Sequence, residues 1–152
     1  KGYWRDQQIT DKVLMPDGWL RTQDMGYVDD DGFYWLTDRE EDMIKTRGEN
    51  VYPSHVEEVI RKLEFVQDVA VVGVDDRRLS ERIVACIVLK PGFNVSNWQE
   101  SVLESCREEL AKHEVPQEIR QIDEVPMNKL LGKVLKNKLR EMILASAGQP
   151  VA

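Results

Sequence analysis

The stretch that decides the fold is residues 68–74, DVAVVGV, together with residues 82–89, RIVACIVL. Both segments are rich in β-branched residues, which favour strands. Neither alternates strictly between apolar and polar residues, so the pattern predicts two strands buried on both faces or nearly so. The polar run between them, residues 75–81 (DDRRLSE), predicts the loop that joins the two strands.

Helical patterns lie on both sides of this strand pair. Residues 54–63 (SHVEEVIRKL) carry an apolar stripe, and Ser54 with Glu57 fits a capping box. A second helix is expected over residues 97–112, and a short strand between Pro116 and Pro126. The helical spacing of leucines in residues 128–141 (NKLLGKVLKNKLRE) predicts a final helix. The resulting order indicates an α+β domain in which helices cover a small sheet.

The first 50 residues have a different character. Residues 1–37 are rich in aromatic residues and turn signals, and Asp30, Asp31 and Gly32 predict a tight turn between two short strands, hence a β-hairpin. Residues 37–50 (TDREEDMIKTRGEN) are almost entirely polar. They are typical of a solvated loop or of a linker between two units.

Composition excludes several classes of function. The chain has 152 residues, 41% of them hydrophobic and 32% charged, which is typical of a soluble globular protein. A net charge of −7 disfavours a general nucleic-acid or membrane-surface role. No apolar run reaches the roughly 18–20 residues that span a bilayer. The N-terminus shows no signal peptide and does not begin with methionine, so we expect a piece of a longer protein.

The cysteines and histidines show no metal-binding pattern. Cys86 and Cys106 lie in apolar stretches without ligand spacing, which indicates buried free thiols of a reducing compartment. His55 and His113 form no recognisable cluster either. We therefore expect a cytoplasmic protein with no metal ligands of its own.

One basic residue in the final segment is unusual. If residues 128–141 form one helix, Lys133 stands in its first turn directly after Gly132, where the helix dipole disfavours a cation by roughly 0.3–1 kcal/mol. A Walker A phosphate loop does not explain it, because Val134 follows the lysine where Ser or Thr is required. Lys129, Lys133, Lys136 and Arg140 would form a basic stripe, which is usually a solvated face but also suits phosphates. These alternatives stay open on the residues alone.

Three segments together resemble the signature segments of the adenylate-forming superfamily, which includes acyl-CoA synthetases, adenylation domains of peptide synthetases and luciferases. They are residues 19–26 (WLRTQDMG), 38–60 (DREEDMIKTRGENVYPSHVEEVI) and 124–141 (EVPMNKLLGKVLKNKLRE). The segments occur in the family's order and at about its spacing, so the resemblance covers nearly the whole chain. Asp38 before Arg39, together with NVYP at residues 50–53, is most similar to the fatty-acyl-CoA ligase branch.

The resemblance implies a reaction in two steps. A carboxylic acid attacks the α-phosphate of ATP to give acyl-AMP, and coenzyme A then displaces AMP. A small C-terminal domain rotates between the steps. By this comparison residues 1–38 end the large N-terminal domain, 39–42 form the hinge, 43–147 form the mobile C-terminal domain and 148–152 a tail. ATP, Mg²⁺ and coenzyme A would be bound mainly by or with the missing N-terminal domain.

The same resemblance assigns residues near the nucleotide and at the hinge. Asp24 matches an aspartate that accepts hydrogen bonds from the ribose hydroxyls, and Arg39 an arginine that contacts the nucleotide near the ribose. The family usually has glycine where Gln23 stands. Glu41 matches the hinge residue, with Asp42 as the neighbouring alternative.

Two further matches concern the chemical steps. The loop expected to enter the active site for thioester formation comprises Lys45, Arg47, Gly48, Glu49 and Asn50, and Gly48 is expected to allow close backbone approach or a positive φ. Lys133 matches the catalytic lysine of the adenylation step. Pro126 and Lys133 are seven positions apart, one more than the family usually has, and Lys129 is the alternative lysine.

The resemblance predicts the C-terminal domain of an AMP-forming acyl-CoA ligase, inactive alone, whose partners are its own N-terminal domain, a carboxylic acid (most similar to the fatty acids), ATP and coenzyme A. Neither nucleic acid nor a transmembrane segment is expected, although the full-length protein could lie at a membrane periphery. Two alternatives remain: a non-catalytic interaction domain that uses the basic final helix, and the equivalent domain of a peptide-synthetase adenylation unit.

Overall fold

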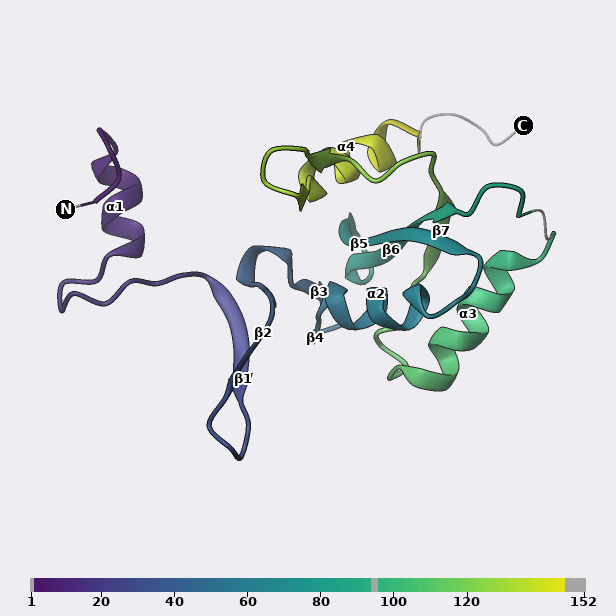
Figure 1. Cartoon of the computed structure of the whole chain (residues 1–152), viewed down its shortest axis with the longest axis horizontal. Helices are drawn as coiled ribbons and strands as arrows, with labels where there is room; N and C mark the ends of the chain where they lie inside the picture. The colour runs from purple at the N-terminus through teal and green to yellow at the C-terminus, as the bar shows by residue number, and fades with distance from the viewer. Residues whose placement is uncertain (1, 94–95, 147–152) are drawn as a thin grey trace. The chain divides into compact units, whose positions relative to one another are not determined.

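The computed structural model describes residues 2–93 and 96–146 (Figure 1). It divides into two compact units, Lys1–Glu41 and Asp42–Ala152. The division falls within residues 39–42, where the hinge is expected; motion at that point stays a prediction. The expected tail, residues 148–152, lies outside the described residues.

The first unit contains one helix and one hairpin. Helix α1 (Gln7–Val13) was not expected from the sequence, although Asp6 supplies an ordinary N-cap by accepting a hydrogen bond from the Ile9 amide at 2.9 Å. The predicted hairpin is confirmed, with β1 (Asp24–Val28) antiparallel to β2 (Tyr34–Arg39).

The carboxylate of Asp29 organises the turn of this hairpin. It accepts hydrogen bonds from the Trp35 indole at 2.6 Å and from the Phe33 amide at 2.9 Å. These bonds favour the ionised carboxylate and lower the pKa of Asp29, the indole most of all.

The second unit is built on a five-stranded sheet. Strands β5 (Val66–Asp76) and β6 (Ser80–Leu89) form a long antiparallel pair. Strand β6 also pairs with β7 (Glu118–Gln121) in parallel and, near its start, with β3 (Ile44–Thr46). Strand β3 continues the sheet to β4 (Glu49–Val51), and β5 lies at the opposite edge.

Side chains of the β5–β6 pair alternate between two apolar cores. Helices α2 (Pro53–Arg61) and α3 (Trp98–Glu109) cover one face, and α4 (Lys136–Ser146) covers the other (Figure 1). Val69 and Val71 pack under α2 and α3, whereas Val72 and Val74 pack under α4. Burial of both faces confirms the prediction made from the two apolar runs.

Both cysteines are confirmed as buried free thiols. Cys86 lies in the core under α4 and Cys106 in the core under α3. Burial raises the pKa of each thiol to about 11, because the thiolate would lose its hydration. Both side chains therefore remain protonated, apolar packing groups at neutral pH.

Three expectations about helix ends are wrong. Tyr52 occupies the N-cap of α2 and Pro53 its first position, so Ser54 lies inside the helix; the Glu57 carboxylate instead accepts a hydrogen bond from the Val71 amide at 2.9 Å. Helix α3 ends at Glu109, three residues earlier than expected. Helix α4 begins only at Lys136, because the chain before it forms a short hairpin, β8 (Met127–Asn128) and β9 (Lys133–Val134).

The polar run at residues 37–50 is also more ordered than expected. Ile44 within the run and Val51 directly after it decide this, since both are fully buried in the core under α2 and α3. Between them Thr46 is also buried, and the other polar residues form the exposed part of the β3–β4 hairpin. A run of mostly charged residues does not predict such a hairpin, because the strands are only three residues long.

The core under α4 can be tested with two identical changes on one helix. Leu139 is fully buried and Leu144 is 58% exposed. We expect Leu139→Ala to lower the free energy of unfolding by about 2–5 kcal/mol, because it leaves a cavity against the sheet. Leu144→Ala should change it by less than about 0.5 kcal/mol. Urea titration followed by circular dichroism measures both, and equal losses would contradict the placement of α4.

Candidate functional site

The expected adenylation lysine lies on the β8–β9 hairpin and not in a helix. The side-chain oxygen of Asn128 accepts hydrogen bonds from the Leu130 and Leu131 amides at 3.0 and 3.3 Å. The Asn128 carbonyl accepts a bond from the Gly132 amide at 2.8 Å, and Gly132 has φ +63°. Asn128 and Gly132 thus reverse the chain before Lys133. The prediction that Lys133 lies in the first turn of a helix is wrong. The unfavourable interaction with a helix dipole therefore does not arise.

The side chain of Lys133 is exposed. Within residues 2–93 and 96–146 it has no hydrogen-bond or ion-pair partner. The expected basic stripe does not form, because Lys129 and Lys133 belong to the hairpin, while Lys136 lies 3.8 Å from the Glu57 carboxylate and Arg140 lies 3.9 Å from that of Asp42. Lys133 is therefore an exposed cation without a carboxylate partner among the described residues, as is Lys129 in the same hairpin, whereas Lys136 and Arg140 each face a carboxylate.

The hairpin also accommodates the additional residue between Pro126 and Lys133. The Pro126 carbonyl accepts a hydrogen bond from the Leu135 amide at 2.7 Å, which closes the base of the hairpin. Leu130, in its loop, is 95% exposed. Exposed loop tips tolerate added residues best, so the additional length need not move Lys133.

A second exposed hairpin carries the residues expected at the thioester step. Lys45 pairs with Asn50 and Thr46 with Glu49, which leaves Arg47 and Gly48 as a two-residue turn. Their φ angles are +53° and +84°, the pattern of a type I′ turn. The positive φ expected at Gly48 is confirmed, whereas that of Arg47 was not anticipated.

One carboxylate fastens this hairpin to the sheet. Glu81 on β6 accepts a hydrogen bond from the Lys45 amide at 2.6 Å. Gly73 on β5 makes room for it, since a Cβ there would lie 2.6 Å from the Glu81 Oε1 atom and 2.9 Å from Ile44 Cγ2. The Lys45 side chain is thereby exposed while Ile44 and Thr46 are buried on the other side of the strand.

The two residues expected near the nucleotide are brought together in the first unit. Asp24 and Arg39 are cross-strand neighbours at the ends of β1 and β2, with Asp24 Oδ1 3.7 Å from Arg39 Nε. Gln23 adopts φ +63°, a conformation that glycine takes without strain. Its carbonyl accepts a hydrogen bond from the Glu40 amide at 2.9 Å, which closes the hairpin.

A short 3-10 helix, η1 (Glu40–Asp42), contains the expected hinge residue. Glu41 is exposed. Among the described residues its side chain has no hydrogen bond or ion pair. The neighbouring Asp42 faces Arg140 of α4.

Two absences are established for the described part of the chain. Within it, no group of three or more His, Cys, Asp or Glu side chains could hold a metal ion. None of its helices is both long enough and apolar enough to cross a membrane.

Comparison with known families identifies the second unit. Residues 55–130 match the model of the AMP-binding enzyme C-terminal domain. The chain belongs to this family. The matched range starts just after the β3–β4 hairpin and ends three residues before Lys133, so the match itself does not test the roles expected for these residues.

Relatives of this AMP-binding enzyme C-terminal domain are much longer proteins. The 3-[(3aS,4S,7aS)-7a-methyl-1,5-dioxo-octahydro-1H-inden-4-yl]propanoyl:CoA ligase of Rhodococcus jostii (strain RHA1) is 43% identical over 92% of this chain and 27% of its own. The long-chain-fatty-acid–CoA ligase of Bacillus subtilis (strain 168) is 39% identical over 93% of this chain and 24% of its own. This chain therefore spans about a quarter of the length of these relatives.

A solved structure of the family supports the α+β fold. ATP-bound MatB from Rhodopseudomonas palustris superposes with a TM-score of 0.84 and is 34% identical, over 93% of this chain and 28% of that one. The expected fold class, a small sheet covered by helices, is confirmed by this likeness and by the two cores.

Three residues that the sequence did not predict as part of the candidate site help to hold it in place: Asn128, Glu81 and Arg140. Asn128 carried a usable signal, since an asparagine side chain often accepts a hydrogen bond from the backbone two residues on and so favours a turn. The bond from the Lys45 amide to Glu81 spans 36 positions and left no local signal. Arg140 was assigned to a stripe that does not form.

The turn at Gly48 gives a direct test of its backbone. A Cβ at Gly48 would meet no atom within 4 Å, so any cost of a side chain there comes from its positive φ. We expect Gly48→Ala to lower the free energy of unfolding by about 1–2 kcal/mol. Gly48→Asn should cost less, since asparagine tolerates this conformation. Thermal unfolding measures both, and equal stability of the alanine variant and the unchanged chain would contradict the turn.

Proposed function

We propose that this chain is the C-terminal part of an AMP-forming acyl-CoA ligase, which activates a carboxylic acid with ATP and transfers the acyl group to coenzyme A. Membership of the family and the CoA ligases among its relatives support this proposal. Because the chain spans only about a quarter of those relatives, the activity belongs to the longer protein, and the chain alone is inactive.

The observation that carries the proposal is the exposed Lys133 ammonium on a closed hairpin. In adenylation, a carboxylate oxygen bonds to the α-phosphorus of ATP while the bond to pyrophosphate breaks. Negative charge builds on the α-phosphoryl oxygens, and a positioned cation stabilises it. A donor of this kind typically contributes about 100- to 1,000-fold in rate. Lys133 fits that role because it directly follows the turn at Gly132, as the resemblance requires, and no carboxylate among the described residues pairs with it.

Asp24 and Arg39 are the proposed nucleotide contacts. A carboxylate suits the ribose because its two oxygens can accept bonds from two neighbouring hydroxyls. The Asp24 carboxylate and the Arg39 guanidinium lie 3.7 Å apart, so both side chains are within reach of one nucleotide. Gln23 adopts the left-handed backbone conformation that glycine, the residue usual in the family at this position, takes without strain.

The β3–β4 hairpin is the proposed element for the second step. There the thiolate of coenzyme A attacks the acyl carbonyl, and AMP leaves with the electrons of the broken bond. Lys45, Arg47, Glu49 and Asn50 present polar groups on the hairpin, and Gly48 lets its backbone approach the pantetheine arm closely. Glu81 keeps the hairpin fixed to the sheet through the Lys45 amide.

Alternation between these two hairpins requires a hinge, and we assign it to Glu41. The residue lies in η1 beside the boundary of the two compact units. Hinges are few residues that absorb large changes in backbone angles. Since no described group holds the Glu41 side chain, its backbone can change without breaking a side-chain contact.

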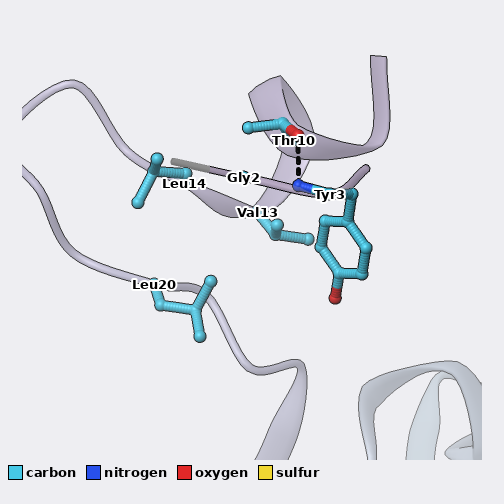
Figure 2. A pocket seen from close by; sticks show the side chains of 6 residues that line it. All are labelled: Gly2, Tyr3, Thr10, Val13, Leu14 and Leu20. Atoms are coloured by element: carbon cyan, nitrogen blue, oxygen red, sulfur yellow. Dashed lines mark hydrogen bonds between the residues drawn. The ribbon is translucent and has the colours of Figure 1, made fainter. Parts of the chain in front are cut away.

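The first unit supports the presence of a large N-terminal domain. Six apolar residues of its hairpin are each more than half exposed: Tyr27, Val28, Phe33, Tyr34, Trp35 and Leu36. A hollow of about 410 Å³ lies beside α1, and Val13, Leu14 and Leu20 are among the residues that line it (Figure 2). Two-stranded hairpins with bare apolar faces are marginal alone, so we assign both surfaces to the interior of the large domain.

The acid is proposed to be a fatty acid. Asp38 and the NVYP segment support this, as does the similarity to the long-chain-fatty-acid ligase. The R. jostii relative acts on a bicyclic propanoate, so relatives that are similar in this domain can act on different acids.

Mg²⁺ is assigned to the ATP phosphates and the large domain, since the described residues offer no metal cluster. The buried free thiols suit a cytoplasmic enzyme.

Lys133→Ala in the full-length protein tests the function. We expect acyl-adenylate formation to fall by about 100- to 1,000-fold, because the cation is lost. Thioester formation from supplied acyl-adenylate should persist, because it uses the other hairpin. Pyrophosphate release measures the first half-reaction and consumption of coenzyme A thiol the second.

Lys129→Ala is the matched control, because it removes the same group from the same hairpin. It should leave both half-reactions within about twofold, whereas a collapse in this variant alone would transfer the role to Lys129. Equal loss of both half-reactions in Lys133→Ala, or no loss, would refute the assignment. The 152-residue chain alone should turn over neither substrate, and robust thioester formation by it would refute its proposed dependence on the large domain.

The hinge assignment predicts a different pattern. Glu41→Pro fixes φ near −65° and should slow thioester formation selectively, because the domain can no longer rotate. Glu41→Ala, which removes the same carboxylate but leaves φ free, should retain both half-reactions. Rapid-quench measurement of each step distinguishes the variants. Unchanged thioester rates in the proline variant would count against Glu41 as the hinge.

A further inference from the structure

A chain of charged side chains runs along the outer edge of β5. Among the described residues this strand pairs with β6 alone, so within that part of the chain its outer edge presents backbone groups without strand partners. Glu57 of α2 accepts a hydrogen bond from the Val71 amide at 2.9 Å, and Arg140 of α4 donates one to the Gly73 carbonyl at 3.1 Å. Two helices from opposite faces of the sheet thus meet at one strand.

Arg140 makes three separate contacts through its guanidinium. Its Nε donates to the Gly73 carbonyl, and one terminal nitrogen donates to the Asn137 side chain at 2.8 Å. The other terminal nitrogen lies 3.9 Å from the Asp42 carboxylate. The planar guanidinium directs its donors in fixed, separate directions, which suits three partners at different positions. Arg140 therefore joins α4, the edge of β5 and the residue with which the second unit begins.

The segment that carries Lys133 continues directly into this helix. The hairpin is closed by the bond from the Leu135 amide to Pro126, and α4 starts at Lys136. Lys136 adds a second, looser tie to the sheet edge through Glu57 at 3.8 Å. The position of Lys133 relative to Asp42 thus depends on how firmly α4 is held to β5.

We propose that Arg140 is a positioning residue for adenylation: it holds Asp42 and the Lys133 hairpin to the same strand, so that rotation at residues 39–42 carries Lys133 as part of one rigid body. This inference rests on the proposed function. A misplacement of about 1 Å at a reacting group can cost on the order of 100-fold in rate. The thioester hairpin is held independently by Glu81 and by strand pairing, so it depends less on Arg140.

A purely structural role for Arg140 makes a different prediction. If it only stabilised the sheet edge, its loss would lower both half-reactions together, in proportion to the folded fraction. A positioning role affects the two half-reactions differently: the kcat of adenylation falls, while the KM for ATP and the rate of thioester formation stay unchanged. The split between the two half-reactions is therefore the informative measurement.

The experiment uses the full-length protein with Arg140→Gln, which removes the charge and the fork. We expect adenylation to fall by about 10- to 100-fold, with thioester formation from supplied acyl-adenylate within about twofold. Lys138→Gln is the matched control, because Lys138 is an exposed residue of the same helix with no partner among the described residues. It should leave both half-reactions unchanged.

Asp42→Asn tests the link to the hinge. It should also lower adenylation selectively, and the double variant should be no worse than Arg140→Gln alone, because both changes break one connection. Multiplicative losses would refute the coupling to Asp42. If Arg140→Gln does not fold, the half-reaction split in Asp42→Asn alone decides the question.

Two failures are distinguishable. If Lys133→Ala abolishes adenylation but Arg140→Gln lowers neither half-reaction, or lowers both equally, the positioning role is refuted and the proposed function stands. If the unchanged full-length protein forms no acyl-adenylate from any carboxylic acid, both are refuted.

Discussion

The antiparallel pairing of β5 with β6 is the constraint on which the second unit depends. The two strands match over ten residue pairs, from Val66↔Leu89 to Asp76↔Ser80. Their alternating side chains leave two apolar faces, and neither can remain in water without a large free-energy cost. Helices must cover both, which is why α2 and α3 lie on one face and α4 on the other. The hairpins that bear Lys45 and Lys133 take their positions from this arrangement.

The sequence predicted well those features that follow from a local pattern of hydrophobic residues or from a turn signal. The apolar runs predicted two strands buried on both faces, and the turn residues Asp30, Asp31 and Gly32 predicted the first hairpin. The Cys86 and Cys106 thiols are buried as expected. In each case a local pattern and the tertiary environment favour the same structure, so the pattern was sufficient.

The sequence predicted poorly the short elements whose conformation is fixed by polar contacts. The leucines before Lys136 have helical spacing, yet the Asn128 side chain and the positive φ of Gly132 turn the chain into a hairpin, and Leu131 remains largely exposed. The capping box failed because the helix begins at Pro53, so Ser54 lies inside it, while the Glu57 carboxylate binds the Val71 amide 14 positions along the chain. Such competing partners come from tertiary contacts, which no window of sequence contains. The proposed nucleotide contacts are intermediate: the resemblance indicated Asp24 and Arg39, and the hairpin register makes them neighbours.

The turn at Arg47 and Gly48 has a consequence for the energetics of the thioester step that we propose for this hairpin. Ordering one residue of a flexible loop costs about 1–2 kcal/mol of conformational entropy. In this hairpin the strand pairs, the left-handed turn and the bond from the Lys45 amide to Glu81 already fix the backbone. A preformed hairpin can therefore enter a crowded active site without losing binding energy to its own ordering. The strain at Arg47 is then a cost met once, at folding, and not again in each catalytic cycle.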